Sequence, residues 1–141
     1  VAVFTNGCFD LIHVGHVRYL FDARRLGDFL MIGLNSDASV RAIKGPRRPV
    51  TPEDQRAEVL GALAAVDAVV LFDQPDPLAL IQKVRPQVLV KGGDWPLDRI
   101  VGRDEVVADG GRVLTIPLTP DVSTTAVIGR IAAAHREPTP S

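Results

Sequence analysis

The segment Thr5–His16 reads TNGCFDLIHVGH and follows directly on the apolar run Val1–Phe4. A strand that leads through a glycine-containing loop into a helix places free backbone N–H groups at the carboxyl edge of the strand. The positive end of the helix lies at the same edge, which makes it a ready anion site. The segment therefore predicts a strand–loop–helix unit that binds phosphate.

Four further apolar runs follow along the chain: Phe29–Leu34, Ala68–Phe72, Val88–Val90 and Val113–Ile116. They are rich in Val, Ile and Leu and do not alternate with polar residues, as is typical of strands buried on both faces of a parallel sheet. Helical segments with capping residues separate them, such as those that begin near Thr51 and Ser123. We predict an α/β fold, a Rossmann-like doubly wound sheet of five parallel strands with helices on both faces. Ligands bind such sheets at the carboxyl ends of the strands.

The composition limits the class of protein. With 141 residues, 46% of them hydrophobic, the chain is long enough for one domain, which we place at residues 1–135, with a disordered polar tail at 136–141. A net charge of −1 gives no basic excess for a nucleic-acid partner. One cysteine excludes an internal disulfide, and neither a membrane-spanning run nor a signal peptide is visible. We expect a cytoplasmic protein without a membrane partner.

Two histidines stand at the start of the first predicted helix. His13 and His16 share one helix face, so both imidazoles can donate Nε2–H to phosphate oxygens. Gly15 between them leaves room for a ligand to approach the backbone. A His-x-x-His pair is also half of a transition-metal site, but the third histidine, His135, lies near the C-terminus and no cysteine pair exists. We expect no metal ligated by side chains; a structural role for both histidines is the other alternative.

The residues Gly7-Cys8-Phe9-Asp10 and His13-Val14-Gly15-His16 resemble the signature of the cytidylyltransferase-like superfamily, Gly-x-Phe-Asp followed after two residues by His-x-Gly-His. The resemblance implies that His13 and His16 hold a nucleoside triphosphate and stabilise charge as its α-phosphate is attacked. It also implies that the nucleotide contacts the first loop, at Asn6, Gly7, Cys8, Phe9, Asp10 and Gly15.

A second match lies at the start of the last predicted helix. Members of the superfamily carry Ser-Thr-Thr there, and this chain has Ser123, Thr124 and Thr125. The resemblance implies that the three hydroxyls bind phosphate oxygens, together with the free N–H groups of the first helical turn. Taken alone, the three residues would be read as a helix cap followed by two ordinary helical residues.

Basic residues follow the second helix. Lys44 lies in a proline-braced loop that would otherwise be read as solvated surface, and relatives use the lysine at this place on the nucleotide phosphates. We therefore expect it to act with the histidines in catalysis; Arg47 and Arg48 are further candidates. Arg56 matches an arginine that binds the acceptor's phosphate in relatives, and its fork can engage two oxygens. Without that match it would be an exposed helix residue.

The segment Lys91-Gly92-Gly93-Asp94-Trp95 follows the fourth apolar run. Its two glycines let the main chain pass close to a ligand, so we assign Lys91, Gly92 and Gly93 to nucleotide binding. Asp94 can accept a hydrogen bond from a sugar hydroxyl and is assigned with Trp95 to the acceptor. Trp95 is equally well read as a lid or as a cover for the core.

From Phe4 to about Ile131 the chain is similar to the D-glycero-β-D-manno-heptose 1-phosphate adenylyltransferases. The likeness includes the segments Asn35–Arg41 and Lys44–Pro46. It implies transfer of AMP from ATP to a sugar 1-phosphate, with release of an ADP-sugar and pyrophosphate, and with Mg²⁺ accompanying the nucleotide. It also implies a homodimer and, in some relatives, a kinase domain in a longer parent chain.

Two other functions stay open. A cytidylyltransferase acting on glycerol 3-phosphate shares the first motif, but those enzymes have Arg-Thr-x-Gly-Ile before Ser-Thr-Thr where this chain has Pro117–Val122. A non-catalytic nucleotide-binding module would be expected to lack a polar group of the site, and all of them are present here.

Overall fold

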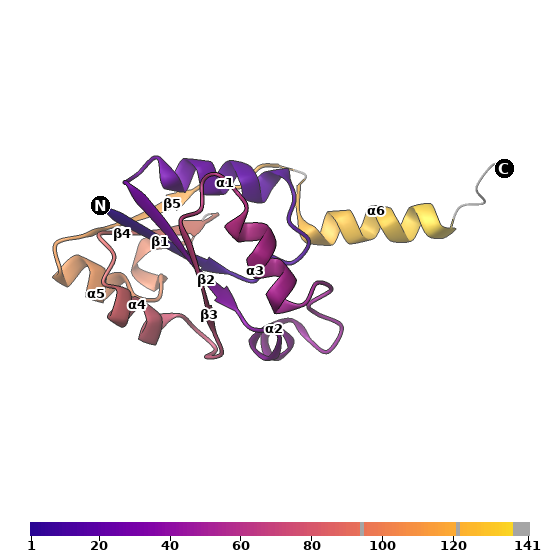
Figure 1. The fold of residues 1–141 in the computed structure, drawn as a ribbon, viewed down its shortest axis with the longest axis horizontal. Helices are drawn as coiled ribbons and strands as arrows, with labels where there is room; N and C mark the ends of the chain where they lie inside the picture. The colour runs from indigo at the N-terminus through magenta and orange to yellow at the C-terminus, as the bar shows by residue number, and fades with distance from the viewer. Residues whose placement is uncertain (94, 121, 137–141) are drawn as a thin grey trace.

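The computed structural model describes residues 1–93, 95–120 and 122–136. Its centre is a sheet of five parallel strands in the order β3-β2-β1-β4-β5 (Figure 1). Each apolar run of the sequence forms one strand, so the predicted Rossmann-like sheet is confirmed. The strands are β1 (Ala2–Gly7), β2 (Phe29–Asn35), β3 (Ala68–Phe72), β4 (Val88–Gly92) and β5 (Arg112–Ile116).

Helices connect the strands. They are α1 (Val14–Arg24), α2 (Asp37–Lys44), α3 (Glu53–Gly61), α4 (Leu78–Val84), the 3₁₀ turn η1 (Leu97–Arg99), α5 (Arg103–Ala108) and α6 (Thr124–Arg136). The N-cap residue of α3 is Pro52 rather than Thr51, and no side chain forms a capping hydrogen bond at this helix end. The last helix includes Arg136, which the sequence had placed in the polar tail, and residues 137–141 lie outside the described ranges.

Two hydrophobic clusters, one on each face of the sheet, explain why the strands do not alternate with polar residues. Val3 of β1 joins the cluster that α1 and α3 cover, which includes Leu20 and Leu60. The next residue, Phe4, joins the other cluster, to which α4 and α5 contribute Ile81 and Val106. Successive residues of a strand point to opposite faces, so a strand buried on both sides must be apolar throughout.

The winding of the sheet reverses between β1 and β4, which are neighbours although two strands separate them in sequence. Crossovers leave in opposite directions at this point, so the loops after the two strands part and leave a crevice. The helix α6 extends away from the body of the molecule (Figure 1), and its first turn lies near the crevice. In the described part of the chain, no helix is long and apolar enough to cross a membrane.

Candidate active site

A cavity of about 430 Å³ opens at the carboxyl ends of β1 and β4 and at the first turns of α1 and α6. It is lined by every residue that the sequence assigned to catalysis and all but Gly93 of those assigned to the nucleotide: Asn6, Gly7, Cys8, Phe9, Asp10, His13, Gly15, His16, Lys44, Lys91, Gly92, Ser123, Thr124 and Thr125. Tyr19, Arg48, Leu118, Thr119 and Val122 complete the wall. We call it the phosphate pocket.

The two histidines begin helix α1 with their own side chains. His13 is the N-cap residue, and its Nδ1 accepts from the backbone N–H of Gly15 at 3.1 Å. The Nδ1 of His16 accepts in return from the backbone N–H of His13 at 3.2 Å. This is a capping box in which imidazole nitrogens replace the usual hydroxyl and carboxylate. The rings stack with their centroids 3.9 Å apart.

These bonds decide which ring nitrogen carries the proton. A neutral imidazole has one donor and one acceptor nitrogen, so each Nδ1 that accepts leaves Nε2–H as the donor. Burial, and secondarily the neighbouring charges of His13 and Lys44, lowers the pKa of His16 from 6.5 to about 4. Burial also lowers the pKa of His13. At neutral pH the pair therefore presents two uncharged Nε2–H donors.

Gly15 has a second task besides the one expected. A Cβ at this position would lie 3.0 Å from Cε1 and Nδ1 of the His13 ring. The missing side chain therefore makes room for the imidazole, which folds back over the first turn, as much as for a ligand.

The carboxylate of Asp10 is buried and faces the protein. Its oxygens accept from the backbone N–H groups of Val50 at 2.8 Å and Thr51 at 3.0 Å. Arg48 Nη1 lies 3.8 Å away. Asp10 thus fastens the segment between α2 and α3 to the first loop.

The three residues of the Ser-Thr-Thr sequence have different hydrogen-bonding roles. Ser123 Oγ accepts from the N–H of Ala126 and so caps α6, while its own hydroxyl hydrogen remains available to a ligand. Thr124 donates its hydroxyl to the carbonyl of Asp10, so it can only accept a further bond. Thr125 is exposed at the pocket wall.

Cations surround the phosphate pocket. Lys44 is the last residue of α2 and is exposed, whereas Arg48 is half-buried beside Asp10. Lys91 comes from β4; burial lowers its pKa, and its Nζ lies 5.4 Å from the centre of the Trp95 ring. Three cations that line one pocket suit a polyanionic ligand.

A second cavity, of about 280 Å³, adjoins the first. The two share the residues at the end of β1 (Asn6, Gly7 and Cys8) together with Lys91. Trp95 and Arg99 also line it, so the predicted acceptor residue Trp95 faces a cavity rather than the core. We call it the side pocket. Asp94, also predicted to bind the acceptor, lies outside the described residues.

Arg56 requires a correction. It was expected to bind the acceptor or to lie exposed on its helix, but only 1% of its surface is accessible. It lines neither the phosphate pocket nor the side pocket. Its guanidinium donates to three backbone carbonyls and to Asp37. The physical reason is that the loops after β1 and β2 and the loop before α3 meet around the guanidinium, and their oxygens accept its N–H groups.

Sequence reasoning missed two side chains. Arg99 follows the Gly-Gly segment by several residues, and nothing in the sequence distinguishes it from other surface arginines. Tyr19 lies on α1; burial raises its pKa to about 12, and its hydroxyl bonds with that of Thr5 at 2.7 Å. A tyrosine in a helix gives no signal for such a contact.

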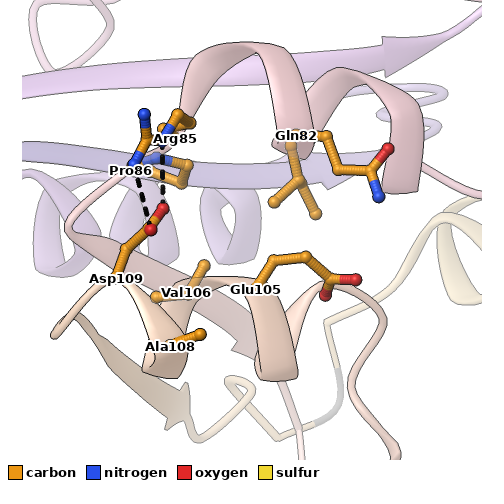
Figure 2. A pocket seen from close by; sticks show the side chains of 8 residues that line it. Gln82, Arg85, Pro86, Glu105, Val106, Ala108 and Asp109 are labelled. Atoms are coloured by element: carbon orange, nitrogen blue, oxygen red, sulfur yellow. Dashed lines mark hydrogen bonds and ion pairs between the residues drawn. The ribbon is translucent and has the colours of Figure 1, made fainter.

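Two further hollows occur. One of about 310 Å³ is lined by residues that include Phe9, Thr51 and Arg56. The other, of about 240 Å³, lies between α4 and α5 (Figure 2). Figure 2 shows Arg85 and Asp109 bonded to each other across one end of it. Nε and Nη2 of Arg85 donate to the carboxylate of Asp109 at 3.1 and 3.0 Å. The chain offers no phosphate-binding pattern there. Among the described residues, no group of three or more His, Cys, Asp and Glu side chains could hold a metal ion.

The fold and the phosphate pocket together define an α/β enzyme of the nucleotidyltransferase class. The cytidylyltransferase-like family model matches residues 4–130, and the chain belongs to that family. It is 58% identical over 136 residues to the bifunctional protein HldE of Syntrophotalea carbinolica, and 54% identical to that of Geobacter sulfurreducens. Each match covers 96% of this chain but only 28% of the relative, so the chain spans little more than a quarter of these proteins.

Solved structures agree with the fold. A lipopolysaccharide core biosynthesis protein from Thermoplasma volcanium superposes with a TM-score of 0.69 at 26% identity, over 84% of this chain and 96% of that one. A pantothenate synthetase from Thermus thermophilus superposes with a TM-score of 0.56 over 96% of this chain and 68% of that one. At 17% identity this second likeness concerns the fold alone.

Proposed function

We propose that the chain transfers AMP from ATP to a sugar 1-phosphate, D-glycero-β-D-manno-heptose 1-phosphate, and releases ADP-heptose and pyrophosphate. The observation that carries the transfer chemistry is the stacked histidine pair, which presents two neutral Nε2–H donors in a pocket with three cations. The identity with HldE proteins supports the choice of sugar.

The two adjoining cavities support a direct displacement. ATP would lie in the phosphate pocket, and the sugar 1-phosphate in the side pocket beside Trp95 and Arg99. The α-phosphate would then lie above their common wall, close to Lys91. A phosphate dianion is already a nucleophile at neutral pH, so the reaction needs alignment and charge stabilisation rather than a general base. His13 and His16 would donate to the oxygens that gain charge.

Mg²⁺ would accompany the triphosphate. The groups that line the phosphate pocket are mainly N–H and cationic donors, which bind phosphate oxygens, and both oxygens of Asp10 already accept backbone N–H groups. This lining fits an ion held mostly through phosphate oxygens and water, as Mg²⁺ prefers. The ion would neutralise charge on the leaving pyrophosphate.

The relatives are named bifunctional proteins, and this chain matches little more than a quarter of their length. We therefore propose that the adenylyltransferase acts beside a kinase domain in a longer parent chain and that it forms a homodimer. Measuring the mass of the purified parent protein in solution would test the dimer.

The reaction is tested by measuring pyrophosphate release from ATP, CTP, GTP and UTP, each with heptose 1-phosphate and with glycerol 3-phosphate. The proposal requires that ATP with heptose 1-phosphate is turned over fastest. Fastest release from CTP with glycerol 3-phosphate would establish the cytidylyltransferase alternative. Nucleotide binding without release from any pair would leave a binding module.

A further inference from the structure

The buried guanidinium of Arg56 is bonded to three loop segments: the one after β1, the one between β2 and α2, and the one before α3. Its Nη1 donates to the carbonyl of Cys8 at 2.6 Å and to that of Asn35 at 2.9 Å. Its Nε donates to the carbonyl of Thr51 at 2.9 Å, and its Nη2 to Asp37 at 2.8 Å. Four of the five N–H groups of an arginine are therefore in use, which leaves no fork for a ligand.

The bond to Cys8 fixes the direction of one peptide group. In a trans peptide the C=O and the N–H of the next residue point in opposite directions. Because the carbonyl of Cys8 points at Arg56, the N–H of Phe9 points away from it. Cys8 and Phe9 both line the phosphate pocket, whereas Arg56 does not. An N–H that points away from Arg56 can therefore face the phosphate pocket, although Phe9 also lines a cavity that Arg56 borders.

The backbone at this point needs such support. Phe9 has a φ of 48°, in the left-handed region that a residue with a side chain rarely adopts. Its ring is buried, and its centroid lies 5.3 Å from that of His16. A short charge-assisted bond to the preceding carbonyl stabilises the peptide in this orientation.

We propose that Arg56 is a positioning residue that turns the Cys8–Phe9 peptide so that the N–H of Phe9 donates to an α-phosphate oxygen of the bound nucleotide. The inference rests on the proposed function, since it places the nucleotide in the phosphate pocket. Arg56 would then act on turnover through the backbone, as an oxyanion-hole donor is preorganised, and would not touch the acceptor.

The first experiment follows backbone amides by NMR while the non-hydrolysable α,β-methylene-ATP is added to ¹⁵N-labelled protein. In the wild type, we expect the Phe9 amide proton to move downfield on saturation. In Arg56→Lys, which keeps the charge but loses the fork, that movement falls to less than half. An unchanged movement in a folded Arg56→Lys protein, or none in the wild type, overturns the proposal.

The second experiment compares kinetics. Arg56→Lys should lower kcat at least tenfold, because loss of one preorganised donor typically costs about 10²–10³ in rate. The KM values for ATP and for the acceptor should each stay within about threefold of wild type. A selective rise in the acceptor's KM would instead make Arg56 an acceptor ligand. The matched control is Asp37→Asn, which weakens the bond that Asp37 accepts from Nη2 of Arg56 and leaves the bond from Nη1 to Cys8 in place. It should keep kcat and the Phe9 movement within about twofold of wild type, and equal losses in both variants would reduce Arg56 to a stabilising role.

A third variant covers the case in which Arg56→Lys does not fold. Replacing Phe9 by its α-hydroxy acid changes the N–H to an ester oxygen and leaves Arg56 in place. We expect kcat to fall about 10²-fold, and an unchanged kcat overturns the proposal. If the wild type turns over no acceptor at all, the proposed function fails, whereas the NMR titration still decides the role of Arg56.

Discussion

Thr124 donates its hydroxyl to the backbone carbonyl of Asp10, which lies 114 residues earlier in the chain. The bond joins the first turn of α6 to the loop that precedes the histidines. Because α6 otherwise extends away from the body (Figure 1), this contact helps to set where the last helix begins relative to the phosphate pocket.

Thr124→Val should therefore loosen one wall of the pocket. We expect the free energy of unfolding to fall by about 1 kcal/mol, the usual contribution of one hydrogen bond, and kcat to fall about tenfold as the α6 donors lose their positions. Chemical denaturation and pyrophosphate release measure the two effects. Thr125→Val is the control: its side chain is exposed, so its stability should stay within about 0.5 kcal/mol of wild type. Equal destabilisation of both variants would contradict the role of Thr124.

Gly15→Ala tests the position of the His13 ring. The added Cβ would approach that ring to 3.0 Å, so the imidazole must shift. We expect kcat to fall about three- to tenfold, since the ring must move by a few tenths of an ångström and misplacing a catalytic group by about 1 Å can cost about 10² in rate. Gly129→Ala in α6 is the matched control, because nothing lies within 4 Å of its Cβ. It should keep full activity and gain up to about 1 kcal/mol of stability.

His16 combines two tasks that substitution can separate. His16→Ala removes both the Nε2–H donor and the acceptor for the His13 N–H, so kcat should fall by about 10²–10³ and stability by about 1 kcal/mol. His16→Gln can still complete a capping box and should recover most of the stability. Rates come from pyrophosphate release and stabilities from urea titration. Near-normal turnover of a folded His16→Ala protein would exclude the proposed role.

The lowered histidine pKa values predict a pH dependence of stability. His16 takes up its proton at about pH 4 when folded but near its ordinary value of 6.5 when unfolded. Between these values the unfolded chain binds more protons, so the free energy of unfolding should fall as the pH is lowered from 6.5 to 4. His13, whose pKa is also lowered, adds to the same slope. The His16→Gln variant should show a shallower slope, and an identical slope would refute the assignment.

Arg99 is predicted to bind the acceptor's charge in the side pocket. Arg99→Met should raise the acceptor's KM about tenfold and leave the KM for ATP within about twofold, as expected for loss of one charged hydrogen bond. Arg103→Met is the control, since Arg103 pairs with Asp104 and does not line that pocket. Parallel changes in both KM values would show that the side pocket is not a separate acceptor site.

The fold was predictable because its strands are buried on both faces, which leaves continuous apolar runs such as Phe29–Leu34. The phosphate pocket was predictable for a related reason: in a parallel sheet the loops after β1 and β4 must meet at one edge. Arg56 was not. Arginine is rarely buried, and its place depends on three carbonyls from separate segments that only the folded chain brings together.

The capping role of the histidines could not be predicted from the sequence either. Their spacing indicated a shared face, but imidazole is not among the side chains that ordinarily cap helices. Nothing in the sequence distinguishes a ring that accepts through Nδ1 from one that projects into solvent. The hydrogen bonds to Gly15 and His13 settle it.

The histidine capping box affects how this site can evolve. The atoms that start helix α1 and the atoms that face the phosphate pocket belong to the same two rings. A mutation that disturbs the first turn is therefore also a mutation of the proposed phosphate donors. Selection for folding and selection for turnover therefore act here on the same residues, and only a side chain that also caps the helix, such as Gln at position 16, separates the two.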